Sequence, residues 1–113
     1  MLNLIEYGSA GALPTLLIVH GLYGSARNWG AIARRMADSR RVVGVDMRNH
    51  GDSFRADSQT YPEMAGDLAE VIRWIGGPVD VVGHSMGGKA SMQLALTDGA
   101  LVNRLVVADI APV

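Results

Sequence analysis

The sequence lacks cysteine and long apolar runs, and each absence narrows the functions open to the chain. With no cysteine among its 113 residues, the chain can form no disulfide, no thiolate metal site and no cysteine nucleophile. No apolar stretch approaches the ~20 residues of a membrane-spanning helix, and the N-terminus lacks the basic and apolar regions of a signal peptide. We therefore expect a cytoplasmic protein with no membrane partner.

The charges and binding motifs of the sequence exclude further classes of function. Ten Lys and Arg residues stand against 11 Asp and Glu residues, a net charge of -1 without a basic cluster, so no nucleic-acid partner is expected. The sequence has no phosphate-binding P-loop motif and no His, Asp and Glu cluster with metal-ligand spacing, so we expect no cofactor and no metal. The length of 113 residues is enough for one modest domain, and a hydrophobic fraction of 49% excludes a disordered tail.

Strand and helix signals alternate along the chain, which predicts an α/β fold. The order indicates a mostly parallel sheet with helices on both faces. Expected strands cover residues 2–7, 15–19, 41–45, 79–82 and 105–109, and expected helices cover residues 28–37, 62–75 and 85–97.

The expected helices show apolar faces at helical spacing. In the first helix the apolar face consists of Trp29, Ile32, Ala33 and Met36. In the second it consists of Met64, Leu68, Val71, Ile72 and Ile75. We interpret both as core-facing surfaces and not as cofactor sites.

Ser85 carries the strongest chemical signal in the chain. It sits in Gly83-His84-Ser85-Met86-Gly87, after an apolar strand and before a helix. A G-x-S-x-G sequence in that context is typical of the nucleophile elbow of serine hydrolases. The small residues allow strand and helix to pass closely, and free N–H groups at the helix start favour a developing oxyanion.

The histidine base that such a serine needs is not evident. All three histidines precede Ser85, whereas this fold places the base after the serine. His50 is interpreted as tying down its loop, His84 as packing under the elbow, and His20 as hydrogen-bonding neighbouring loops. Lys89 could act as the base of a Ser-Lys pair, but its place four residues along the helix points it off the axis of the serine. A solvated or loop-bracing lysine is therefore the favoured interpretation.

An oxyanion hole requires two N–H donors from different segments. The backbone of Met86, directly after the serine, would supply one. The other should come from the glycine-rich loop after the first buried strand, most simply from Leu22, with Tyr23 as the second choice. The alternative interpretation of this loop is a plain strand-to-helix turn.

The last expected strand raises two further points. Asp109, at its end, is a possible alternative acid that would orient a histidine, although a polar strand terminus is the simpler interpretation. The strand is apolar and resembles a central strand, and an exposed apolar edge invites pairing. We therefore expect more polypeptide to belong beside it.

Taken together, these motifs resemble the α/β-hydrolase superfamily, and more narrowly the small esterases of the abhydrolase-domain acyl-esterase group. The matching segments are residues 20–25, 46–53, 83–89 and 109–113. The resemblance implies Ser85 as nucleophile, Leu22 or Tyr23 and Met86 as oxyanion donors, and hydrolysis of short acyl esters or thioesters without a cofactor.

The resemblance also implies a division of the catalytic machinery. Family members are more than twice as long, and they carry a cap, two further strands, the usual acid and the histidine after the region matched here. Residues 1–113 are therefore expected to be the N-terminal part of one hydrolase domain. The expected function is a serine carboxylesterase that is competent only with a complementary C-terminal fragment. A non-catalytic ligand-binding module, a thioesterase and a perhydrolase are the alternatives.

Overall fold

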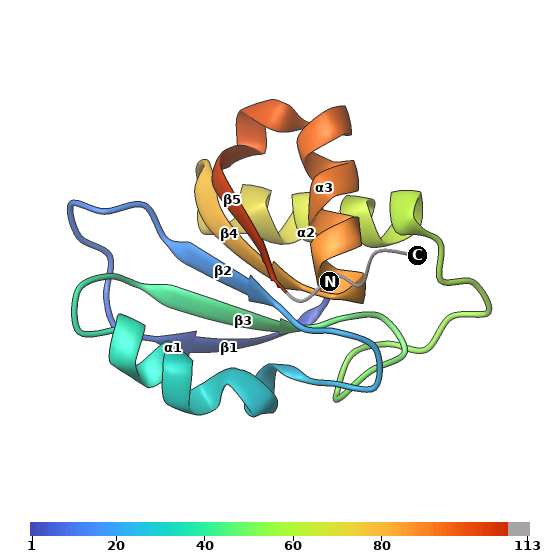
Figure 1. The fold of residues 1–113 in the computed structure, drawn as a ribbon, viewed down its shortest axis with the longest axis horizontal. Coiled ribbons are helices and arrows are strands. Elements are labelled where there is room, and N and C mark those ends of the chain that lie inside the picture. The colour runs from blue at the N-terminus through green and yellow to red at the C-terminus, as the bar shows by residue number, and fades with distance from the viewer. Residues whose placement is uncertain (109–113) are drawn as a thin grey trace.

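A computed structural model describes residues 1–108, which form one sheet covered by helices (Figure 1). The elements are β1 (Asn3–Tyr7), β2 (Leu16–Val19), the 3₁₀ helix η1 (Ala26–Trp29), α1 (Gly30–Met36), β3 (Val42–Asp46), α2 (Tyr61–Ile75), β4 (Val79–His84), α3 (Met86–Thr97), the 3₁₀ helix η2 (Gly99–Leu101) and β5 (Val102–Ala108).

The sheet has the strand order β1-β3-β2-β4-β5. Strand β2 is parallel to both β3 and β4, and β4 is parallel to β5, whereas β1 pairs antiparallel with β3 at the edge. The expected mostly parallel sheet is thus confirmed. The chain leaves β2 toward β3 on one side and returns to β4 on the other, and such reversal points position ligand sites at the carboxyl ends of the strands.

Alternate residues of β2 enter two separate cores, one on each face of the sheet. Leu16 and Ile18 pack with Ala33 of α1, while Leu17 and Val19 pack with residues of α2 and α3. Every residue of β2 and β3 is buried, as expected for strands covered on both faces. Helices therefore lie on both faces, as the sequence predicts (Figure 1).

Helix α2 begins and ends where its sequence indicates. Thr60 accepts the N–H of Glu63, Pro62 lies in the first turn, and Gly76 ends the helix with φ 101°. Met64, Leu68, Val71 and Ile72 are buried and Ile75 is partly buried, so this apolar face is confirmed as core. None of the helices within residues 1–108 is both long and apolar enough to cross a membrane.

The first helix differs from the prediction. A 3₁₀ turn begins at Ala26 because Asn28 accepts the N–H of Ser25, and the α-helix itself starts only at Gly30. The expected apolar face is also wrong in part, since Ile32 is 52% exposed and Met36 is exposed as well. The short helix approaches the sheet through the small residue Ala33, which leaves the larger apolar side chains at its flanks.

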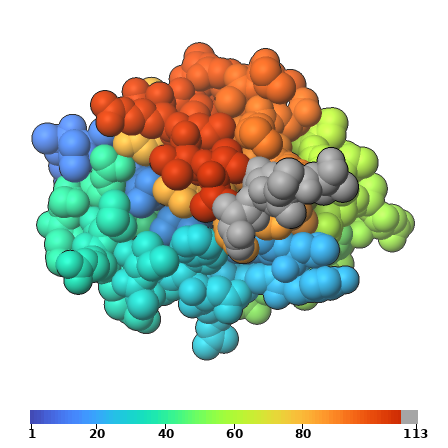
Figure 2. Space-filling model, in the orientation of Figure 1, coloured from blue at the N-terminus to red at the C-terminus, as the bar shows by residue number. Residues whose placement is uncertain are grey.

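The last strand also differs from the prediction. The strand starts at Val102, three residues before the expected Leu105. The prediction began too late because it followed the apolar run, which the polar residues Asn103 and Arg104 interrupt. Asn103 instead donates to the Asp80 carboxylate of β4 at 2.8 Å. Among residues 1–108, β5 is the last strand of the sheet beside β4, and its surface is seen in red in Figure 2. Val106 of this strand is 58% exposed, so the expectation that more polypeptide belongs beside it stays a prediction.

Candidate active site

Three loops leave the sheet side by side at the carboxyl ends of its central strands. Val19, near the end of β2, pairs with Val45 of β3 and with Gly83 of β4. The segments that follow those strands therefore start at the same edge. They carry the motifs that the sequence singles out, around Leu22, His50 and Ser85.

Ser85 occupies a strained turn between β4 and α3. Its backbone has φ 53° and ψ -115°, in the left-handed half of conformational space that non-glycine residues rarely enter. The N–H of Ser85 donates to the carbonyl of Ala108 at 3.1 Å, and its carbonyl accepts the N–H of Lys89 at 3.0 Å. Such strain persists only where surrounding structure holds it, and it is frequent at active sites.

The glycines around Ser85 are required by close approaches. A Cβ on Gly83 would lie 2.7 Å from Cα of Gly88, and a Cβ on Gly87 would collide with the carbonyl oxygens of Val19 and His20. A Cβ on Gly21 would lie 3.2 Å from Cβ of Ser85. The elbow is thus packed against the end of β2 and against the loop that contains Leu22.

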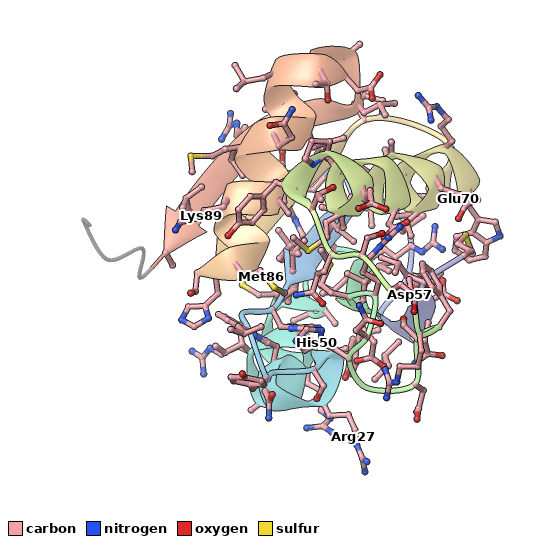
Figure 3. The ribbon with its side chains drawn as sticks, turned by 90° about the vertical axis from the view of Figure 1, so that its right-hand side faces the viewer. Arg27, His50, Asp57, Glu70, Met86 and Lys89 are labelled. Atoms are coloured by element: carbon pink, nitrogen blue, oxygen red, sulfur yellow. The ribbon has the colours of Figure 1, made fainter. Side chains whose placement is uncertain are left out.

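Ser85 lines a hollow of about 330 Å³ at this edge. Its lining comprises Leu22, Gln59, Tyr61, Met64, Ser85, Met86 and Lys89. Lys89 projects from the same end of α3 as Met86 (Figure 3). Lys89 is exposed, as expected for a solvated lysine, and it lines the same hollow as Ser85.

The two candidate donors in the loop after β2 differ in availability. The N–H of Tyr23 donates to Nε2 of His50 at 3.1 Å. Within residues 1–108, no hydrogen bond takes up the N–H of Leu22. Met86 is the first residue of α3, and the first N–H groups of a helix have no partner inside the helix. The geometry therefore favours Leu22 over Tyr23 as the partner of Met86.

Three side chains tie the loop after β2 to the loop after β3, and we call His20, Asp46 and His50 the loop brace. Met47 donates its N–H to Nε2 of His20 at 2.9 Å. A carboxylate oxygen of Asp46 accepts the N–H of Ala26 at 2.9 Å, and His50 accepts that of Tyr23. The expected loop-binding roles of His20 and His50 are both confirmed.

The ionisation of the brace follows from burial and hydrogen bonding. Burial lowers the pKa of His20, an effect that outweighs its hydrogen bond to Gly21. Burial also disfavours the Asp46 carboxylate, but the N–H groups of Ala26 and Asp52 more than offset it and lower the pKa of Asp46. At neutral pH the brace thus contains an uncharged His20 beside an ionised Asp46.

No histidine of the described part of the chain hydrogen-bonds the Ser85 hydroxyl. Both ring nitrogens of His50 are taken up by backbone groups. His84 packs edge-on against Trp29 of η1, with ring centroids 5.7 Å apart. Asp109, the possible alternative acid, lies outside the described residues.

Two residues of the hollow carry no signal in the sequence. Gln59 lies just before α2 and Tyr61 is the first residue of that helix, and Gln59 contacts the sulfur of Met86 at 3.4 Å. Their positions depend on the path of the polar loop after β3, which no motif specifies.

Comparison with known proteins places this geometry in a family. Residues 16–113 match the Alpha/beta hydrolase family. The mouse sn-1-specific diacylglycerol lipase ABHD11 is 46% identical over 114 residues, which cover 98% of this chain and 36% of the mouse protein. Esterase YbfF of Escherichia coli is 43% identical over 101 residues, covering 87% of this chain and 39% of that protein.

A solved structure agrees with these relatives in fold. A marine microorganism esterase superposes with a TM-score of 0.88 at 42% identity, over 99% of this chain and 43% of the esterase. The chain thus spans well under half the length of the proteins it matches. With the family match extending from β2 onward, the chain belongs to the alpha/beta hydrolase family.

Proposed function

We propose that the protein is a serine carboxylesterase whose nucleophile is Ser85. The proposal rests on the strained turn between β4 and α3, which places Ser85 at the hollow. The relatives named esterase and lipase support the same reaction class.

The proposed reaction proceeds through an acyl-enzyme. The Ser85 oxygen bonds to the acyl carbon while a base takes the serine proton, and the C–O or C–S bond to the leaving group breaks as that group receives the proton. Water then attacks the acyl carbon, which releases the acid and regenerates the serine. The N–H groups of Met86 and Leu22, with the start of α3, would stabilise the oxyanion in both steps.

The base and acid are proposed to come from a complementary C-terminal fragment of the same hydrolase. Within residues 1–108, no side chain hydrogen-bonds the Ser85 hydroxyl, so a serine in this setting would remain a weak nucleophile. The matched relatives contain further sequence of sufficient length to supply these groups.

Short acyl esters or thioesters are the proposed substrates. Leu22, Met64 and Met86 give the hollow an apolar side suited to an acyl chain, while Gln59 and Lys89 give it polar groups. Its volume of about 330 Å³ lies at the lower end of the range for small-molecule sites.

The test combines native mass spectrometry with covalent labelling. A fluorophosphonate should phosphonylate Ser85, with the serine proton passing to the base and fluoride leaving. We expect labelling and p-nitrophenyl acetate hydrolysis in the sample that contains the complementary fragment, and loss of both in Ser85→Ala. The matched control Ser9→Ala removes an exposed serine of the first turn and should change neither.

Three other outcomes would each change the proposal. Ser85-dependent activity of a lone chain would refute the need for a second fragment. A complex with no label and no activity would favour a non-catalytic ligand-binding module. A labelled protein that cleaves an acyl thioester much faster than its oxygen ester would be a thioesterase.

A further inference from the structure

We propose that His20 and His50 are positioning residues that aim the N–H of Leu22 at the oxyanion. They would act by fixing the two peptide units on either side of Leu22. This inference rests on the proposed function, because it assigns a catalytic purpose to a brace that would otherwise only stabilise loops.

His20 fixes the peptide unit before Leu22. Its Nδ1 lies 2.7 Å from the carbonyl oxygen of Gly21, and its Nε2 lies 2.9 Å from the N–H of Met47. A carbonyl requires a donor and an N–H requires an acceptor, so the ring is the neutral Nδ1–H tautomer. In a trans peptide the C=O and N–H point in opposite directions. Holding the Gly21 carbonyl toward His20 therefore turns the N–H of Leu22 away from that ring.

His50 fixes the peptide unit after Leu22 in the same manner. Its Nδ1 lies 2.8 Å from the carbonyl oxygen of Arg48, so this nitrogen must be the donor and Nε2 the acceptor. Nε2 then receives the N–H of Tyr23 at 3.1 Å. The two rings contact each other, with centroids 5.1 Å apart, so the two peptide units next to Leu22 are held by neighbouring side chains.

The backbone at Tyr23 shows why an acceptor is needed there. Tyr23 has φ 62°, a conformation that is unfavourable for a bulky residue. Its side chain is 91% exposed, so side-chain packing contributes little to holding that conformation. The hydrogen bond to His50 and the turn closed by Gly24 N–H to the Gly21 carbonyl at 3.0 Å are what hold it.

The position of the loop makes its orientation relevant to catalysis. Gly21 approaches Ser85 so closely that an added Cβ would lie 3.2 Å from the serine Cβ, and Leu22 lines the hollow beside Ser85. A rotation of the Gly21–Leu22 peptide unit would move the N–H of Leu22 relative to the reaction centre, and a displacement of the next peptide unit would shift it through the backbone of Leu22. Small misplacements of such groups can cost about 100-fold in rate.

A pair of conservative variants separates this role from simple loop stability. In His50→Gln the amide oxygen can occupy the place of Nε2 and accept from Tyr23, without a titratable ring. In His50→Asn the amide can replace Nδ1 and bond to Arg48, but it cannot reach Tyr23. Both variants are polar and remove the ring, and they differ in which of its two hydrogen bonds they keep.

Steady-state kinetics of the active protein, together with its complementary fragment, provides the first readout. We expect His50→Asn to lower kcat by about 10- to 100-fold with KM little changed, somewhat less than complete loss of an oxyanion donor. His50→Gln should restore kcat to within a few-fold of wild type. Rates are normalised to the folded fraction from urea unfolding. Equal kcat values for the two variants would overturn the inference.

Imidazole ¹⁵N NMR provides a second readout that needs no turnover. Both His20 and His50 should be Nδ1–H tautomers at neutral pH, and a protonated Nε2 on either ring would overturn the inference. The two proposals fail differently. If Ser85 is not a nucleophile, wild type and both variants lack Ser85-dependent turnover, whereas the tautomers of His20 and His50 persist. In that case the catalytic role of these two histidines is refuted together with the proposed function.

Discussion

At the scale of single residues, backbone strain is concentrated at the carboxyl edge of the sheet. Within residues 1–108, the non-glycine residues with positive φ are Tyr23, Asn49 and Ser85, one in each of the three loops described above. Each such conformation costs of the order of 1–3 kcal/mol. Each donates its backbone N–H in a hydrogen bond, to the ring of His50, to the carbonyl of Phe54 and to the carbonyl of Ala108 respectively. Strain therefore accumulates where the proposed reaction takes place.

We expect His20 to make the stability of the protein depend on pH. Burial lowers its pKa in the folded state, with the neighbouring His50 acting in the same direction and Asp46 in the opposite one. The unfolded chain, with a pKa near 6.5, therefore binds the proton more readily. The contribution of neutral His20 to the free energy of unfolding is therefore fully present above that pH. It is lost as the pH falls, by at most about 1.4 kcal/mol per pH unit.

The measurement is urea unfolding across this range for wild type and His20→Gln, which can still accept from Met47. The variant should show a flatter dependence of the unfolding free energy on pH below about 6.5. An unchanged slope in the variant would show that another group is responsible.

The choice between Leu22 and Tyr23 shows where sequence reasoning ends at this scale. The motif around Ser85 identified the turn, and glycine spacing predicted the close approaches that the structure contains. Nothing local distinguishes the two neighbouring N–H groups. The distinction comes from His50, which lies 27 residues away along the chain and reaches Tyr23 only in the folded state.

At the scale of elements, the contact between α3 and β2 depends on Gly87. A methyl group at this position would collide with the carbonyl oxygens of Val19 and His20, which belong to backbone and cannot rotate away. We expect Gly87→Ala to destabilise the protein by about 1–3 kcal/mol and to shift Ser85 with the start of the helix. Urea unfolding and fluorophosphonate labelling report the two effects.

Gly77 offers a control for the Gly87 substitution. A Cβ on Gly77 would meet nothing within 4 Å, so Gly77→Ala should leave both stability and labelling close to wild type. Equal losses in the two variants would contradict a specific contact between α3 and β2.

The start of α2 is stabilised by an acidic cap. Hydrogen bonds from Ser58 and Thr60, with the nearby Arg48, lower the pKa of Glu63 to about 2 from 4.5. Because the folded pKa is the lower one, the stabilisation is complete above about pH 4.5 and is lost as the pH falls toward about 2. Glu63→Gln should flatten the acid limb of a plot of unfolding free energy against pH. A variant with the acid limb of wild type would refute this role.

The elements could be predicted from the sequence where their buried surface is uniformly apolar. Strands β2 and β3 are buried on both faces and α2 has a continuous apolar stripe and a glycine stop, so all three were expected. Helix α1 and strand β5 were misjudged because tertiary contacts determine them. The small residue Ala33 sets how α1 meets the sheet, and Asn103 bonds to Asp80 of the neighbouring strand.

At the scale of the whole molecule, the two faces of the sheet are covered unequally. Helices α2 and α3 pack together over one face, whereas the short α1 covers part of the other (Figure 1). Beside α1 lies a hollow of about 330 Å³, lined in part by Leu13, Leu16, Met36, Val82 and Val106. An apolar surface of this kind next to an edge strand favours association with other polypeptide.

The last prediction follows from that surface. Val106 is 58% exposed on β5 and lines the hollow, so its burial would contribute to any association through this face. We expect the isolated chain to self-associate with rising concentration. Val106→Lys should weaken that association by about tenfold, because burial of the 58% of Val106 that is exposed would contribute a little over half of the ~1.5–3 kcal/mol of a fully buried valine.

Sedimentation velocity over a concentration series measures this effect, with Leu96→Lys as the matched control. Leu96 is 84% exposed on α3 and does not line the hollow, so it receives the same charge on a different surface. If charge alone governs association, the two variants change it equally and the sheet face has no special role. If the sheet face governs it, only Val106→Lys weakens self-association, and the complementary fragment should compete with self-association for the same surface.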